Sequence, residues 1–199
     1  MSEHRFILLD AGASRPTRVP LPPAMAVKAG TEDTEGRFSL LEVVVAQEIP
    51  RHVHHVSDEC VYVLDGELAV EFDDRTHTVA AGQFVLLPHG VPHALRPAGP
   101  RPPRVLQISS PGGWECFLQD MIENRTQISR QGRLDPAPLN RIAARHQITY
   151  EEPGQPGPAQ AAAPDSDSGS GSGSGSNGSG STSETASGTG TSSGQRESA

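Results

Sequence analysis

Short apolar runs separated by turn residues fill the middle of the chain. From Phe38 the segment FSLLEVVVAQEIP is rich in β-branched residues and ends at a proline, which predicts a strand. Further runs follow in ECVYVLDGELAVEFDD, THTVAAGQFVLLPHGVPHALRP and RVLQISSPGG, and DG, DD, AG and PHG turn signals divide them. Strands this short and this tightly joined predict an all-β fold, an antiparallel sandwich or barrel.

The hydrophobic period changes after Gly113. In WECFLQDMIENR the apolar residues recur at helical spacing, at Trp114, Phe117, Leu118, Met121 and Ile122. This pattern predicts a helix that lays an apolar face on the sheet. In LDPAPLNRIAARHQI, Asp135 suits an N-cap and Pro136 the first helical position, which predicts a second helix to about His146.

The two ends of the chain differ from this middle part. Residues 16–23, PTRVPLPP, hold four prolines and predict an arm or edge segment. From Gly157 the chain is mostly Ser, Gly, Ala and Thr, which predicts a disordered tail whose origin stays open. We therefore predict an N-terminal arm at 1–23, a barrel at 24–113, a helical extension at 114–156 and a disordered Gly/Ser-rich tail at 157–199.

Charge and cysteine content narrow the classes of partner and compartment. The formal net charge is −8, of which the tail contributes −3, leaving −5 on the remainder. An acidic domain without a basic cluster argues against nucleic acid or an anionic membrane as partner. Two cysteines outside any CxxC pair, with no segment long enough to span a bilayer, predict a reduced cytoplasmic protein.

Three histidines within four positions open the segment RHVHHVSDECVYVLDGEL at residues 51–68. On a strand His52 and His54 share one face, while Val53 and His55 point to the other. Two imidazoles on one face can bind one metal ion. Glu59 lies five positions after His54, so a strand across residues 52–65 needs a bend or bulge at HVSD before Glu59 can join them.

A second segment, GQFVLLPHGVPH at residues 82–93, completes a two-part pattern. The first part is His52, His54, Glu59 and Gly66, and the second is Gly82, Pro88, Gly90 and His93. In both parts the sequence resembles the cupin superfamily. The resemblance implies a small antiparallel jelly-roll β-barrel whose cavity holds one divalent metal ion, with His52, His54, Glu59 and His93 as ligands.

Two positions depart from the cupin pattern. Ala46 stands where a glycine is usual, and Pro97 stands where an asparagine is usual. Both lie outside the implied ligand set, so they concern the local backbone rather than metal binding. A looser similarity over about residues 35–153 is carried by SSPGGWECFLQDM and IAARHQITYEEPG, and it resembles single-domain bacterial cupins that include quercetin dioxygenase-like proteins.

The resemblance implies a metal-dependent dioxygenase, an oxidoreductase, acting on a small enolic or aromatic, flavonol-like substrate. Glu59 would be both ligand and catalytic base, taking the proton of a substrate hydroxyl before O2 attacks. Ligands without thiolate suit Fe, Mn, Ni, Co, Cu or Zn and leave the choice open. A metal-dependent isomerase or cyclase that consumes no oxygen, and a non-catalytic binding module, are the alternatives. The resemblance also implies a homodimer.

The remaining polar residues near these segments are assigned simpler roles. His55, His77 and His89 are expected at the surface or in loops, and Asp58 at the strand entry or against a ligand imidazole. By parity with Glu59, Tyr62 should face outward while Val61 and Val63 line the inside. An apolar lining without a convergent Arg or Lys suits a flat aromatic substrate.

Overall fold

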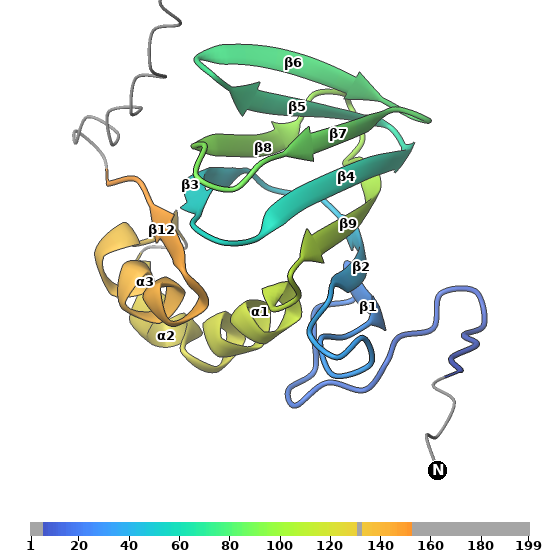
Figure 1. Cartoon of the computed structure of the whole chain (residues 1–199). Helices are drawn as coiled ribbons and strands as arrows, with labels where there is room; N and C mark the ends of the chain where they lie inside the picture. The colour runs from blue at the N-terminus through green and yellow to red at the C-terminus, as the bar shows by residue number, and fades with distance from the viewer. Residues whose placement is uncertain (1–5, 131–132, 153–199) are drawn as a thin grey trace, which may run out of the picture. The chain divides into compact units, whose positions relative to one another are not determined.

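The computed structural model describes residues 6–130 and 133–152 (Figure 1). One five-stranded sheet has the order β1 (Met25–Ala29), β2 (Ser39–Val44), β9 (Arg104–Ser110), β4 (Asp58–Asp65) and β7 (Phe84–Leu87). The other has the order β12 (Ile148–Tyr150), β3 (Ile49–His54), β8 (His93–Pro97), β5 (Glu67–Phe72) and β6 (Arg75–Ala80). Every pairing within them is antiparallel, so the predicted all-β fold is confirmed.

Three rows of inward side chains cross the first sheet from β2 through β9 to β4. Because alternate residues of a strand share a face, the register fixes which side chains stand side by side. The rows are Val43–Val105–Val63, Leu41–Gln107–Val61 and Ser39–Ser109–Glu59. All nine side chains are buried. The barrel interior is therefore apolar in one row and becomes polar in the row that contains Glu59.

The connection between β3 and β4 corrects one sequence expectation. Residues 52–65 do not form a single strand with a bulge: β3 ends at His54, and β4 begins at Asp58 in the other sheet. The segment FSLLEVVVAQEIP is likewise two pieces, with β2 ending at Val44 and β3 beginning at Ile49. In both places a few residues carry the chain from sheet to sheet, which alternation along one segment does not reveal.

The C-terminal extension contains the two predicted helices, α1 (Trp114–Glu123) and α3 (Pro136–Ala143). Asp135 caps α3 as expected, its side chain accepting a hydrogen bond from the Ala137 N–H. A single turn, α2 (Arg125–Ile128), a short hairpin of β10 (Ser129–Arg130) and β11 (Arg133–Leu134), and a 3-10 turn (Ala144–His146) complete it. Trp114, Phe117 and Leu118 bury the apolar face of α1 in the core.

Strand β12 was not predicted, and it returns the extension to the barrel. It pairs with β3, placing Tyr150 opposite His52 and Ile148 opposite His54. In Figure 1, α2 and α3 lie beside β12 and α1 extends from them toward β2, away from β5 and β6. The predicted tail at 157–199 lies outside the described residues. In the described ranges, no helix has the length and apolar character needed to cross a bilayer.

Candidate metal centre

The structure brings His52, His54, Glu59 and His93 together inside the barrel. One ligand atom from each lies within 4.8 Å of the others, and all four residues are buried. The Nε2 atoms of His52 and His54 are 3.1 Å apart. Glu59 Oε2 lies 3.2 Å from His93 Nε2 and 3.4 Å from His54 Nε2. Side chains converging at these distances can surround one ion.

Three strands in two sheets position these side chains. His52 and His54 point inward from β3, and His93 stands opposite His52 on the neighbouring strand β8. Glu59 approaches from β4 in the other sheet. The Gly90 N–H donates a 2.7 Å hydrogen bond to the His54 carbonyl, which ties the turn before His93 to the end of β3. The ion would therefore lie between the two sheets.

Backbone carbonyls orient two of the imidazole rings. His52 Nδ1 lies 2.8 Å from the Pro50 carbonyl oxygen, and His93 Nδ1 lies 2.9 Å from that of Val91. A carbonyl only accepts hydrogen bonds, so each Nδ1 carries a proton. The Nε2 atoms of both rings are directed into the cluster, as in histidines that bind metals.

The Glu59 carboxylate has a partner that the sequence did not indicate. Gln107 Nε2 donates a 2.8 Å hydrogen bond to Glu59 Oε1, which leaves Oε2 toward the histidines. Burial acts to raise the pKa of Glu59, but contacts with the His54 and His93 imidazoles, and the charge of those rings when protonated, hold it well below its usual range. Glu59 is therefore a carboxylate despite being buried.

Burial also keeps His52 neutral. Desolvation first, and then the neighbouring His93 and His54 rings, lower the pKa of His52 to about 3. A neutral imidazole is the form that binds a metal ion. Three imidazole nitrogens and one carboxylate oxygen, with no thiolate among them, fit a divalent transition metal. A cation at the centre would also pair with the negative charge of the buried Glu59 carboxylate.

Aromatic side chains of the C-terminal extension cover this cluster. The Tyr150 ring stacks on His52 at 5.1 Å between centroids, and Trp114 lies 6.1 Å from His52 and 5.2 Å from His54. Sequence periodicity placed Trp114 on a buried helix face but gave no link to the histidines. The sequence did not indicate that Tyr150 is near the histidines, because β12 has only three residues, too few to show a hydrophobic period. Burial raises the pKa of the Tyr150 phenol, so it stays protonated.

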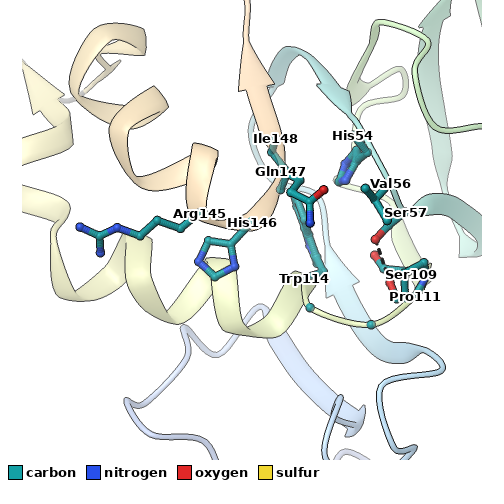
Figure 2. Close-up of a pocket in the computed structure, with 12 residues that line it drawn as sticks. His54, Val56, Ser57, Ser109, Pro111, Trp114, Arg145, His146, Gln147 and Ile148 are labelled. Carbon is teal, nitrogen blue, oxygen red and sulfur yellow. Dashed lines mark hydrogen bonds between the residues drawn. The ribbon is translucent and has the colours of Figure 1, made fainter.

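Two cavities reach the surroundings of the cluster, and Trp114 lines both. The first, of about 210 Å³, has His54, Ser57, Ser109 and Gln147 in its wall. Figure 2 shows His54, Trp114 and Gln147 around this space, whereas the Arg145 side chain extends away from them. The second, of about 360 Å³, is largely apolar and is bounded by Gln107, Trp114 and Tyr150 together with side chains of β2 and α1.

The other candidate residues lie outside the cluster. His55 and His77 are exposed, and His55 Nε2 contacts Thr149 Oγ1 at 2.9 Å. Asp58 accepts hydrogen bonds from the backbone N–H and the ring of His89, at 2.9 and 2.7 Å, so it holds a loop rather than a ligand imidazole. Tyr62 faces outward, and Val61 and Val63 are buried, as parity predicted.

Comparison with known proteins agrees with this architecture. Residues 39–109 match a family model described as a cupin domain. Protein SchB of Streptomyces halstedii is 36% identical over 66 residues, covering 33% of this chain and 48% of that protein. Polyketide synthase CurC of Streptomyces cyaneus is 32% identical over 78 residues, covering 39% and 51%. The chain spans about half the length of the curated relatives it matches.

Solved structures also resemble this chain. The polyketide cyclase RemF from Streptomyces resistomycificus is 28% identical, with a TM-score of 0.39 over 43% of this chain and 63% of that one. KdgF from Halomonas sp. is 19% identical, with a TM-score of 0.40 over 49% and 90%. The residues matched by the cupin-domain model include all four members of the buried cluster, and this match together with the antiparallel two-sheet fold supports a relationship to the cupin superfamily.

Proposed function

We propose that this domain is a metal-dependent enzyme that cyclises or isomerises a small enolisable or phenolic substrate. The convergence of His52, His54, Glu59 and His93 beside a cavity carries the proposal. The ion held by these four residues would act as a Lewis acid that stabilises negative charge on a substrate enol or phenol oxygen.

Glu59 is the residue that we assign to proton transfer. Its pKa is held low, it is ionised, and Gln107 engages only its Oε1. Oε2 can therefore accept a proton from a substrate carbon or hydroxyl that reaches the cluster. His52, whose pKa burial lowers to about 3, is neutral and adds no positive charge beside this carboxylate.

The walls of the approach suit a neutral, flat substrate. Trp114 and Val56 supply apolar surface to the cavity that reaches His54. Arg145, the only Arg or Lys among the residues lining this cavity, directs its side chain away from it (Figure 2). Apart from the metal ion, a strongly anionic substrate such as a sugar phosphate would meet no Arg or Lys directed into this cavity among the described residues.

The match to a polyketide synthase supports the choice of substrate class. Chains of condensed ketide units contain acidic C–H groups between carbonyls, and closure of such a chain needs an enolate but no oxidant. This chemistry requires a Lewis acid and a base at one point, which the cluster and Glu59 can supply. The similarity to CurC covers 39% of this chain and 51% of that protein, so the proposed substrate class rests on the chemistry of the site as well as on the similarity.

A dioxygenase acting on the same kind of substrate is the second candidate. The donor set of three imidazoles and a carboxylate also suits redox-active Fe, Mn, Ni, Co or Cu. The narrower likeness to quercetin dioxygenase-like proteins stays a prediction, as do the homodimer and the cytoplasmic location. Consumption of O2 separates the two reactions.

The test begins with elemental analysis of protein purified without chelator. We expect about one transition metal ion per chain, lost in His93→Ala and retained in the matched control His77→Ala, whose histidine is exposed.

The reaction is then tested with poly-β-carbonyl and flavonol substrates, by mass spectrometry of the products and by an oxygen electrode. A product of unchanged mass, or one changed only by loss of water, without O2 uptake supports the cyclase or isomerase. Metal-dependent O2 uptake supports the dioxygenase, and turnover by Glu59→Gln at the wild-type rate contradicts the role of Glu59.

A further inference from the structure

The row of inward side chains that contains Glu59 also contains two serines. On the first sheet Ser109 stands directly opposite Glu59, and Ser39 stands directly opposite Ser109. Side chains at such paired positions have their Cβ atoms about 4.5–5.5 Å apart. Ser109 is 2% exposed and Ser39 is fully buried. Two hydroxyls are thus fixed beside the carboxylate of the candidate metal centre.

Neither serine hydroxyl has a hydrogen-bond partner among the residues the structure describes. A buried, unpaired polar group costs free energy, so such groups are few in folded proteins and each calls for an explanation. Gln107 provides the contrast. It points inward from the same strand two residues earlier, and its amide is engaged by Glu59. Gln107 therefore hydrogen-bonds the carboxylate, whereas the Ser109 hydroxyl remains available to hydrogen-bond a ligand.

Ser109 also lines the cavity that has His54 in its wall. A second serine of that cavity, Ser57, already donates a 2.9 Å hydrogen bond to the Pro111 carbonyl oxygen (Figure 2). Ser109 therefore combines three properties: it is buried, it has no partner in the described part of the chain, and it faces the space from which His54 is reached.

We infer that Ser109 is a substrate-binding residue whose hydroxyl hydrogen-bonds a phenolic or enolic oxygen placed beside Glu59 and His54. This deepens the proposed function and rests on it for the substrate class. A neutral hydroxyl can accept a hydrogen bond from a phenol and donate one to an enolate, so the Ser109 hydroxyl can bind the substrate oxygen both before and after that oxygen loses its proton.

The test measures binding of 4-nitrocatechol, a coloured phenol, to metal-loaded protein by absorbance titration. We expect Ser109→Ala to weaken binding about 3- to 10-fold, the range of one hydrogen bond, while metal content is unchanged. The matched control Ser110→Ala should bind the probe as the wild type does, because Ser110 is not among the residues lining this cavity and its hydroxyl already donates a 3.0 Å hydrogen bond to the Arg37 carbonyl oxygen.

Thermal unfolding of the metal-free proteins supplies a readout that does not depend on activity. Removing an unpaired buried hydroxyl should leave the Tm of Ser109→Ala equal to or above that of the wild type, whereas Ser57→Ala, which loses a hydrogen bond, should unfold at a lower temperature. Unchanged probe affinity in Ser109→Ala, a clear fall in its Tm, or failure of the wild type to bind the probe would overturn the inference. Probe binding that depends on Ser109, without turnover of any enolisable substrate, would instead refute the proposed enzyme and leave the inference standing.

Discussion

Gln107 Nε2 donates a 2.8 Å hydrogen bond to Glu59 Oε1 inside the barrel. The two residues lie on neighbouring antiparallel strands, with Gln107 in the row next to that of Glu59, and they are 5% and 1% exposed. In this environment an amide hydrogen bond has no competition from water, so it fixes the carboxylate rather than merely contacting it. The orientation of Glu59 therefore depends on a residue that contacts none of the histidines through a hydrogen bond in the described structure.

Replacing Gln107 should weaken metal binding. In Gln107→Leu the volume is nearly kept, but Glu59 Oε1 loses its donor and the carboxylate can turn away from the cluster. We expect metal affinity to fall about 10- to 100-fold, as for other residues that orient a metal ligand. Competition titration against a chromogenic chelator measures it, with Gln127→Leu on the exposed surface as control. Equal affinities in wild type and Gln107→Leu would contradict this role.

The metal-free protein should lose stability as the pH falls from about 6.5 to about 3. The pKa of His52 is lowered from its ordinary 6.5 to about 3, so between these values the unfolded chain binds a proton that the folded chain does not. Glu59 acts in the same direction at the acid end, because its pKa is also lowered. Stability therefore rises with pH across this window, by about 1.4 kcal/mol per pH unit for one proton.

Urea unfolding of wild type and His52→Gln in chelator at several pH values measures this linkage. Subtracting the two curves removes the titration of surface carboxylates, which both proteins share. The difference should grow in favour of the wild type as the pH rises from about 4 to 6.5 and then level off. Parallel curves across that range would show that His52 is not held neutral by burial.

Tyr150 should matter for stability through its ring rather than its hydroxyl. The ring is 3% exposed, stacks on His52 and contacts Phe117, whereas no hydrogen bond of the hydroxyl is found in the described residues. Tyr150→Ala should lower the free energy of unfolding by about 3–5 kcal/mol, as for other buried aromatic residues. Tyr150→Phe should stay close to the wild type. A loss in Tyr150→Phe as large as in Tyr150→Ala would assign the effect to the hydroxyl.

Gly112 should not tolerate a side chain. A Cβ at this position would lie 2.8 Å from Thr31 Oγ1 and 2.9 Å from the carbonyl carbon of Phe38, and the latter is backbone that must shift. Gly112→Ala should therefore destabilise the protein by about 1–3 kcal/mol. The control Gly99→Ala, whose Cβ would make only ordinary contacts with Glu67, should be nearly neutral in thermal unfolding. A Gly112→Ala variant as stable as the wild type would mean that the backbone around Thr31 and Phe38 can move to make room for the added methyl group at little cost in stability.

The sequence alone determined the features that depend on neighbouring residues. Short apolar runs between turn signals identified the strands, helical spacing identified the buried face of α1, and Asp135 followed by Pro136 identified the start of α3. The two-part pattern also named the four residues of the cluster, because each part keeps its residues at fixed positions along one stretch of chain. These signals are local, so they can be read without knowing which strands are neighbours.

Only the tertiary structure decided how these elements meet. Glu59 reaches the histidines from the opposite sheet rather than around a bulge, and the register of β9 against β4 and β2 is what places Gln107 and Ser109 beside it. Tyr150 arrives on a strand of three residues, too short to show a period. Strand order and register are set by side chains that come from distant parts of the chain and pack against one another across the core. For this reason the local sequence pattern predicted the four residues of the cluster but not the residues that surround them.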